Sequence, residues 1–526
     1  MTRSRQRAAR RDNSRRPRRP SIPEPVWTLR RGTGLLSLDV FGAALDRLVL
    51  VPADIHGLVA GELAGSGTPL PASYPDIRLA AERQAWRRAR RSGRAFIGLA
   101  DIADELVALL PSDGSDPRGL GRLAIAREVA LERRLSRPNP EAVAAVAEAR
   151  RQGVPVAFVA DTYLPRDLVA ALLRSAGLPA ELVLVSSHEG ATKDGGDLFR
   201  HLADRAGVRL DRIVHLGPDP AIDVGGPARM GIDARRLVPA HRSVAAGLAG
   251  GVDGPSALDS VALALAARRL GAGRAGGSST VAGTPAAPSP EVGYGVAGPL
   301  SVGFAAWVGA QIDDQQPDLV LFADAAAHRT PALVQELRPD LPADRLRPLP
   351  VVSPDSVAWL VDHELAGTGC PPDPRVLVVG LGWPDPEHRR VSRVLAGAGA
   401  RTATVGGAYL GLVEPAGERE RVETWAFGPG PPPPHDPAPV ATAGARDLLA
   451  GLMAPPQDCG EVARGIDDFT RDLSPWLNDG GASLTAALAT PALKLVERQA
   501  EQPATPVPET DAPPPERRSR VPGRHR

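Results

Sequence analysis

Short apolar runs alternate with helical patterns between Gly34 and Pro239. The runs that predict buried strands cover residues 35–40, 156–160, 182–186 and 213–216. Helix-length segments separate the last three runs, and in residues 166–176 leucines recur at helical spacing. Strands that alternate with helices indicate a parallel sheet with crossover helices. We therefore predict an α/β fold here, with its chemistry at the carboxyl ends of the strands.

The interval from about residue 50 to residue 150 is strongly helical in pattern. Apolar positions at helical spacing cover residues 77–83, 102–110 and 123–135. Asn139, Pro140 and Glu141 together predict the start of a further helix. Because this interval follows the first strand, we predict a helical cap inserted there and able to close over the end of that strand.

A second alternating pattern begins at about residue 291. Pro299 predicts the first turn of a helix from about Gly298. Residues 318–324 and 375–383 predict buried parallel strands, and residues 402–412 predict another strand. We therefore predict a second α/β domain, followed by mainly helical residues from 441 to 496.

Composition predicts where the chain is unstructured. Gly, Ala, Ser and Pro dominate from about Gly271 to Pro290, and a proline-rich spacer begins at Gly428. The predicted division is a disordered basic tail (1–24), an α/β domain (25–245) with the cap at about 50–150, a helix and flexible linker (246–290), a second α/β domain (291–427), a proline-rich spacer and helical segment (428–500), and a disordered tail (501–526).

Charge and cysteine content exclude several classes of protein. The formal net charge is +1, so bulk charge indicates no partner. The first twenty residues hold nine arginines without an aromatic residue between them, which favours a disordered tail over a nucleic-acid-binding arm. Cys370 and Cys459 are too few for a disulfide framework and have no zinc-site spacing. We expect no membrane span and a cytoplasmic location, and the sequence indicates no protein partner.

Lys193 is one of only two lysines among 62 lysines and arginines. It follows the apolar run at residues 182–186, and a lysine supplies a compact point charge that an arginine cannot. A surface lysine without a function is the alternative. If the lysine is functional, it lies where a phosphate-handling site would need it.

Acidic residues occupy the ends of the other predicted strands. Asp39, Asp161 with Thr162, and the loop that holds Asp219 and Asp223 each follow an apolar run. Carboxylates beside one lysine suit Mg²⁺ and a phosphoryl group, and an aspartate at such a position can act as a nucleophile. Each aspartate alone could equally form a turn or a helix N-cap.

Residues from about 30 to 245 resemble the haloacid dehalogenase (HAD) superfamily, and more narrowly a bacterial subgroup of large hydrolase-like proteins linked to surface-polysaccharide synthesis. The matching motifs are the Leu-Asp-Val-Phe run at 38–41, VAFVADTYLP at 156–165, Lys193, and the loop at 217–224. The resemblance implies a Rossmann-like sheet with a helical cap after the first strand.

The resemblance also implies roles for single residues. It makes Asp39 the nucleophile and a Mg²⁺ ligand, has Lys193 brace the phosphate, and gives Asp219 and Asp223 to the metal. A phosphorylated small molecule would lie near Asp161 and Thr162. His188 is expected either in solvent or against that substrate, and His215 is expected as a core histidine.

The chain departs from the family motifs at four positions. Ala43 and Ala160 replace residues with hydroxyl groups, Pro218 replaces the usual metal-binding aspartate, and Phe41 replaces the general acid/base, as in the dehalogenase branch. Loss of general acid/base help alone costs about 10²- to 10⁴-fold in rate. The sequence thus predicts a HAD-like phosphohydrolase of reduced activity. The alternative is a catalytically inactive interaction or regulatory protein associated with cell-surface glycan synthesis.

Overall fold

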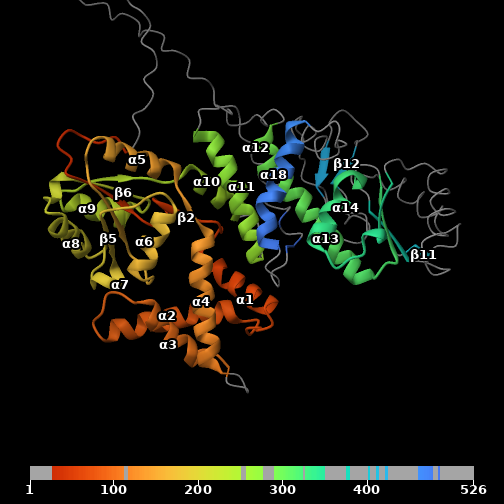
Figure 1. The fold of residues 1–526 in the computed structure, drawn as a ribbon, viewed down its shortest axis with the longest axis horizontal. Coiled ribbons are helices and arrows are strands. Elements are labelled where there is room, and N and C mark those ends of the chain that lie inside the picture. The colour runs from red at the N-terminus through yellow and green to blue at the C-terminus, as the bar shows by residue number, and fades with distance from the viewer. Residues whose placement is uncertain are drawn as a thin grey trace, which may run out of the picture. The chain divides into compact units, whose positions relative to one another are not determined.

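The computed structural model describes residues 27–111, 116–249, 256–275, 289–323, 326–349, 375–379, 401–402, 410–413, 421–424, 460–477, 484–485 and 488. The chain divides into two compact units (Figure 1). Unit 1 consists of Met1–Ala44, Pro138–Thr162 and Arg166–Leu237. Unit 2 consists of Leu45–Arg137, Tyr163–Pro165 and Val238–Arg526.

Unit 1 is built on a five-stranded sheet in the order β5-β4-β1-β6-β7, and every neighbouring pair is parallel. The strands are β1 (Leu35–Asp39), β4 (Val156–Ala160), β5 (Leu182–Val185), β6 (Ile213–Gly217) and β7 (Asp233–Arg236). The four strands predicted from apolar runs are confirmed. The edge strand β7 has the sequence DARR, so hydrophobic periodicity missed it.

Helices flank this sheet (Figure 1). They are α5 (Pro140–Arg151), α6 (Arg166–Ser175), α7 (Ser186–Glu189), α8 (Asp197–Ala206) and α9 (Gly226–Arg229), with the short turns η2 (Leu210–Arg212) and η3 (Pro220–Gly225). Helix α5 begins as predicted, because Asn139 Oδ1 accepts a hydrogen bond from Glu141 N at 3.1 Å. Asn139 Nδ2 also donates to Ala43 O at 2.8 Å, which ties the start of α5 to the loop after β1.

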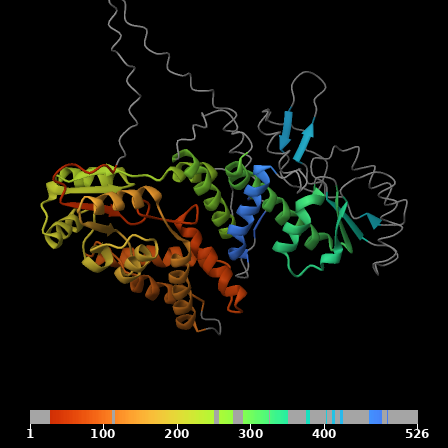
Figure 2. The ribbon, with the colours of Figure 1, turned by 45° about the horizontal axis from the view of Figure 1, so that its top comes forward.

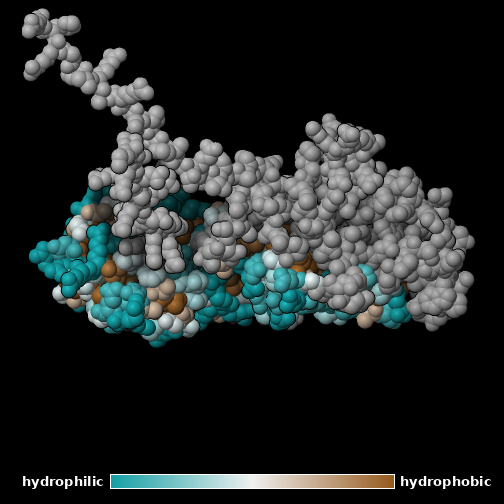
Figure 3. Space-filling model, turned by 90° about the horizontal axis from the view of Figure 1, so that it is seen from above, coloured by the Kyte–Doolittle hydropathy of each residue, from teal (hydrophilic) through white to brown (hydrophobic). Residues whose placement is uncertain are grey.

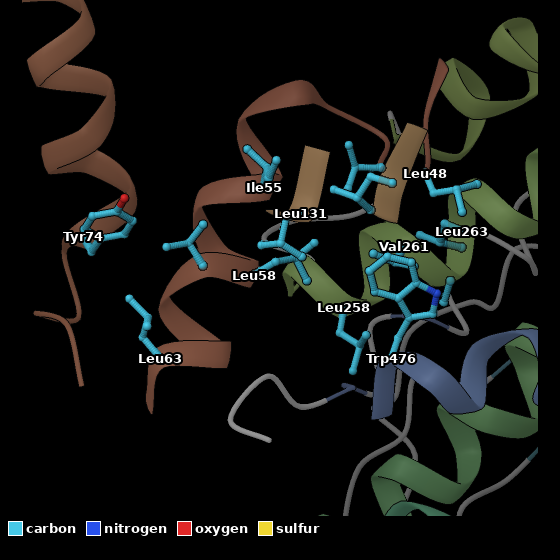
Figure 4. Packing of buried hydrophobic residues seen from close by; sticks show 14 of the residues in the cluster. Leu48, Ile55, Leu58, Leu63, Tyr74, Leu131, Leu258, Val261, Leu263 and Trp476 are labelled. Carbon is cyan, nitrogen blue, oxygen red and sulfur yellow. The ribbon is translucent and has the colours of Figure 1, made fainter. Parts of the chain in front are cut away.

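The helical insertion after β1 is confirmed and lies in unit 2. It comprises η1 (Pro52–Asp54), α1 (Ile55–Gly65), α2 (Tyr74–Arg91), α3 (Leu99–Leu109) and α4 (Pro117–Leu135), between the paired short strands β2 (Leu45–Arg47) and β3 (Ser136–Pro138). One buried apolar cluster joins these helices to α10 (Ala240–Ala249), α11 (Ala257–Ala275) and α18 (Glu461–Leu477). Figure 4 shows Leu58 and Leu131 of the insertion packed near Leu258 and Trp476.

Unit 2 also holds a four-stranded parallel sheet in the order β11-β10-β8-β9. Its strands are β8 (Leu319–Ala323), β9 (Leu346–Leu349), β10 (Arg375–Val379) and β11 (Arg401–Thr402), with α12 (Pro290–Val292), η4 (Gly293–Ala297), α13 (Gly298–Gln315), α14 (Ala326–Leu337) and η5 (Ala343–Arg345) alongside them in the chain. The predicted strands at β8 and β10 and the predicted helix at α13 are confirmed.

The strand predicted over residues 402–412 falls mostly on residues 403–409, which lie outside the described residues, and its two described ends belong to different sheets. Thr402 ends β11, which pairs with β10, whereas β12 (Leu410–Val413) pairs antiparallel with β13 (Arg421–Thr424). Figure 2 shows β12 and β13 as two neighbouring antiparallel arrows.

The prediction that the chain is unstructured from about Gly271 is wrong for residues 271–275, because α11 continues to Ala275. A Cβ on Gly271 would lie 2.5 Å from His241 Cα, so glycine is needed here for the close approach of α10 and α11. Residues 276–288, both predicted tails before residue 27 and after residue 500, and the spacer at Gly428 lie outside the described residues.

One described segment, Pro290–Gln315, is long and apolar enough to cross a membrane, although the sequence suggested no such stretch. It is mostly buried inside the structure, and its apolar side chains pack in a core cluster with Val320 and Phe322 of β8. This is the environment of a buried core helix. On the face drawn in Figure 3, the coloured residues are mostly hydrophilic, with scattered hydrophobic residues between them.

Candidate active site

The carboxyl ends of the strands in unit 1 bring a lysine and two aspartates into contact. Lys193 Nζ donates hydrogen bonds to Asp39 Oδ1 at 2.5 Å and to Asp223 Oδ1 at 2.6 Å. Strand β1 lies between β4 and β6, so its end is next to the loops that follow both neighbours. The three side chains are almost fully buried, with residue exposures of 5%, 4% and 2% for Asp39, Lys193 and Asp223.

Asp161 fixes the backbone of the lysine loop. Both of its carboxylate oxygens accept a hydrogen bond from Lys193 N, each at 3.1 Å. Gly196 then closes the loop, because its N–H donates to Lys193 O at 2.9 Å and its φ of +78° favours glycine. Asp161, at the end of β4, therefore positions Lys193 without touching its ammonium group.

Asp223 is held by the loop after β6. A Cβ on Gly217 would lie 2.4 Å from Asp223 Cβ, so only glycine leaves room for this carboxylate. Asp223 Oδ2 accepts a hydrogen bond from Asp219 N at 3.0 Å. Asp219 itself accepts hydrogen bonds from Ala221 N and Ile222 N at 2.7 Å and 2.8 Å, so its side chain caps the turn η3.

Thr162 is hydrogen-bonded to Ser186, and His188 is exposed to solvent. Thr162 N donates to Ser186 Oγ at 3.0 Å, and the same hydroxyl donates back to Thr162 O at 3.3 Å. His188 lies exposed on α7. The structure thus joins Asp39, Asp161, Lys193 and Asp223 in one network, and the substrate contacts assigned to Thr162 and His188 stay predictions.

Two polar residues inside the sheet were not recognised as neighbours of this site. His215 on β6 is fully buried, as expected of a core histidine, and its Nδ1 hydrogen-bonds Ser37 Oγ of β1 at 2.9 Å. Its Nε2 lies 3.6 Å from Asp223 Oδ1. The signal in the sequence was a polar residue inside each of two apolar runs, and the strand register places Ser37 opposite His215.

Burial and charge together set the protonation states. Burial raises the pKa of Asp39 to about 6, although Lys193 opposes this rise. Burial alone would lower the pKa of Lys193, but the carboxylates of Asp39 and Asp223 outweigh it and raise that pKa. Burial alone would raise the pKa of Asp223, but His215 and Lys193 outweigh it and lower that pKa. At neutral pH an ammonium therefore lies between two carboxylates.

These residues do not fit Mg²⁺ as a resident ion. Among the residues that the structure describes, no group of three or more His, Cys, Asp or Glu side chains is placed to hold a metal. Asp39 and Asp223 each bind the Lys193 ammonium, and Asp161 binds the Lys193 backbone. Mg²⁺ needs several oxygen ligands in octahedral geometry, whereas both oxygens of Asp161 and of Asp223 and one oxygen of Asp39 already accept hydrogen bonds from nitrogen donors.

The hydroxyl groups missing from the motifs are also missing from the site. Ala43 follows β1 and Ala160 ends β4, and both are buried, with exposures of 0% and 1%. A bound anion would therefore find no side-chain donor at either position. The charged donor Lys193 is already shared by the carboxylates of Asp39 and Asp223.

The fold and the site define an α/β protein in which a helical insertion follows the first strand of a parallel sheet. No family model matches the chain, and no curated protein matches it.

Solved structures do match. A 2-haloacid dehalogenase from Pseudomonas syringae is 19% identical, with 38% of this chain and 83% of that chain covered and a TM-score of 0.29. The HAD-hydrolase YfnB from Bacillus subtilis, bound to magnesium, is 17% identical, with 38% and 85% covered and a TM-score of 0.29. A predicted phosphoglycolate phosphatase from Haemophilus somnus is 13% identical, with 39% and 88% covered and a TM-score of 0.26.

Proposed function

We propose that this chain is a hydrolase that cleaves small phosphate esters slowly, with Asp39 as the nucleophile. The observation that carries the proposal is the buried contact of 2.5 Å between Asp39 and Lys193 at the end of the central strand. A carboxylate with a pKa of about 6 is ionised at neutral pH, and its remaining oxygen is able to attack. Lys193 would offset part of the negative charge that develops on the phosphoryl group.

The proposed reaction has two steps. Asp39 attacks phosphorus, the bond from phosphorus to the ester oxygen breaks, and the leaving alkoxide takes a proton from water. A second water then attacks the aspartyl phosphate, which releases inorganic phosphate and restores the carboxylate. Phe41 cannot transfer a proton to the leaving group, so the rate should be about 10²- to 10⁴-fold below that of a complete site.

The test is phosphate release from a panel of small phosphate esters, with and without added Mg²⁺. We expect slow release by the natural chain, loss of at least about 10²-fold in Asp39→Asn, and a clear fall in Lys193→Arg. Asp211→Asn removes an exposed carboxylate of unit 1 and serves as the matched control, which should keep the full rate. An unchanged rate in Asp39→Asn would remove Asp39 from the mechanism.

A non-catalytic binding or regulatory protein is the second candidate. Two observations favour it. Asp39 and Asp223 already neutralise the charge of Lys193, and positions 43 and 160 lack hydroxyl groups. A role near cell-surface glycan synthesis and a cytoplasmic location belong to this proposal. Calorimetric binding of inorganic phosphate without any ester turnover would favour it, and robust turnover would end it.

A further inference from the structure

The chain leaves unit 1 between Thr162 and Tyr163 and returns between Pro165 and Arg166. Asp161 and Thr162 thus belong to the site-bearing sheet, whereas Tyr163–Pro165 groups with the helices of the insertion. The contacts of Tyr163 hold this three-residue segment in unit 2. How Tyr163 is held therefore bears on the path of the site residues directly before it.

Tyr163 makes three contacts within unit 2. Its hydroxyl donates to Glu128 Oε1 at 3.2 Å, and the guanidinium carbon of Arg78 lies 5.3 Å from the centre of its ring. Its backbone oxygen accepts a hydrogen bond from Leu99 N at 2.9 Å. Helices α2, α3 and α4 each contribute one of these contacts, so the side chain and the backbone of Tyr163 are both held.

The group that holds the tyrosine hydroxyl is itself rigid. Arg78 Nε donates to Glu128 Oε2 at 2.9 Å, and Arg78 Nη2 donates to Glu128 Oε1 at 2.8 Å. Both side chains are fully buried. A bidentate pair of this kind has defined geometry, and breaking it would leave an uncompensated buried charge. Glu128 is therefore a fixed point for the tyrosine.

On the other side of the Thr162–Tyr163 peptide bond, the chain is tied to the lysine loop. Thr162 N donates to Ser186 Oγ, and Asp161 accepts from Lys193 N through both oxygens. Thr162 directly precedes Tyr163, and Asp161 lies two positions before it. A displacement of Tyr163 would therefore also displace Thr162 and Asp161. The Lys193 backbone would lose its acceptor in the same movement.

We propose that Tyr163 is a positioning residue, which the buried Arg78–Glu128 pair fixes so that Asp161 keeps the Lys193 loop in place. The proposal concerns the order of the site and does not depend on which reaction occurs there. Removing the tyrosine hydroxyl should loosen residues 161–165 and the lysine loop while the insertion helices stay intact. Simple packing of Tyr163 within the insertion predicts no change at Lys193.

The test is amide hydrogen exchange of the whole chain carrying Tyr163→Phe, read by mass spectrometry. One lost hydrogen bond, at about 1 kcal/mol, should raise exchange about two- to tenfold in peptides from residues 160–165 and 190–196. Peptides from α2 and α4 should keep their protection. Exchange at 190–196 equal to that of the natural chain, or a uniform rise in all peptides, would overturn the proposal.

Tyr74→Phe is the matched control. Tyr74 is buried in the insertion, and within the described part of the chain its hydroxyl has no hydrogen-bond partner. Its loss should leave exchange at residues 190–196 unchanged, and a rise equal to that of Tyr163→Phe would count against the proposal. Because the readout needs no turnover, a failed phosphatase assay leaves this test intact.

Discussion

The ammonium of Lys193 lies within 2.6 Å of oxygens from both Asp39 and Asp223. An arginine at this position would bring a planar fork with five donors into a site that holds one nitrogen. The chain uses arginine at almost every other basic position, and this geometry explains why position 193 is a lysine. The rare residue type was therefore an informative signal in the sequence.

His56 is a second buried ionisable residue, and it sets a dependence of stability on pH. Burial lowers the pKa of His56 to about 4, and Glu128 only partly opposes this, with its Oε2 3.9 Å from Nδ1. The unfolded chain binds the proton at a pKa near 6.5, so the folded state favours the neutral ring. Its contribution, at most roughly 3 kcal/mol, is complete above pH 6.5 and is lost as pH falls toward 4.

Denaturant unfolding at a series of pH values between 4 and 7 checks this prediction. As the pH falls from 7 to 4, the natural chain should lose more unfolding free energy than His56→Asn, which has no proton to gain, because the raised pKa of Asp39 affects both proteins alike. Equal slopes in the two proteins would show that His56 does not titrate as its burial requires.

Residue types alone could predict only part of the site. Asp39, Asp161, Lys193 and Asp223 could be found because each follows an apolar run that ends a strand. Asp219 had two open interpretations, ligand or N-cap, and its bonds to Ala221 N and Ile222 N match the second. The nearness of His215 to Asp223 depends on side-chain rotamers, which no pattern in one sequence specifies.

At the scale of elements, apolar runs correctly predicted the buried strands, but they could not reveal a strand with polar side chains. Strands β1, β4 and β6 are buried along their whole length and β5 along its second half, so each has the sequence of a nearly continuous apolar run. Strand β7 has only β6 as a neighbour and carries polar side chains, which left no periodicity to find. The end of α11 was missed because composition does not reveal a glycine that packs against a neighbouring helix.

The contact of α10 with α11 makes a prediction at this scale. Gly271→Ala places a methyl group 2.5 Å from His241 Cα, so the helices must separate, at an expected cost of about 1–3 kcal/mol in unfolding free energy. Gly309→Ala in α13 is the control, because the nearest atom, Arg338 Cγ, lies 3.6 Å away. There we expect no loss and a gain of up to about 1 kcal/mol. Equal effects of the two substitutions would contradict the close approach.

Across the whole molecule, sequence order and spatial grouping differ. The insertion that interrupts the first α/β pattern shares its buried cluster with α10, α11 and α18, which come more than a hundred residues later. For example, the guanidinium carbon of Arg134 in α4 lies 4.4 Å from the ring centre of Trp476 in α18. Each of these helices has the ordinary pattern of an amphipathic helix. That pattern shows which face is apolar but does not show which other helix the face packs against.

The central claim at this scale is that residues from four separate strand ends meet in one network around the buried Lys193. Chemical acetylation of lysine, followed by mass spectrometry, tests it directly because the chain has only two lysines. Lys193 is buried and its pKa is raised, so it should react at least about tenfold more slowly in the native chain than in urea. The combined substitution of Asp39→Asn and Asp223→Asn should restore much of that rate. Acetylation of native Lys193 at the rate of the unfolded chain would contradict the account.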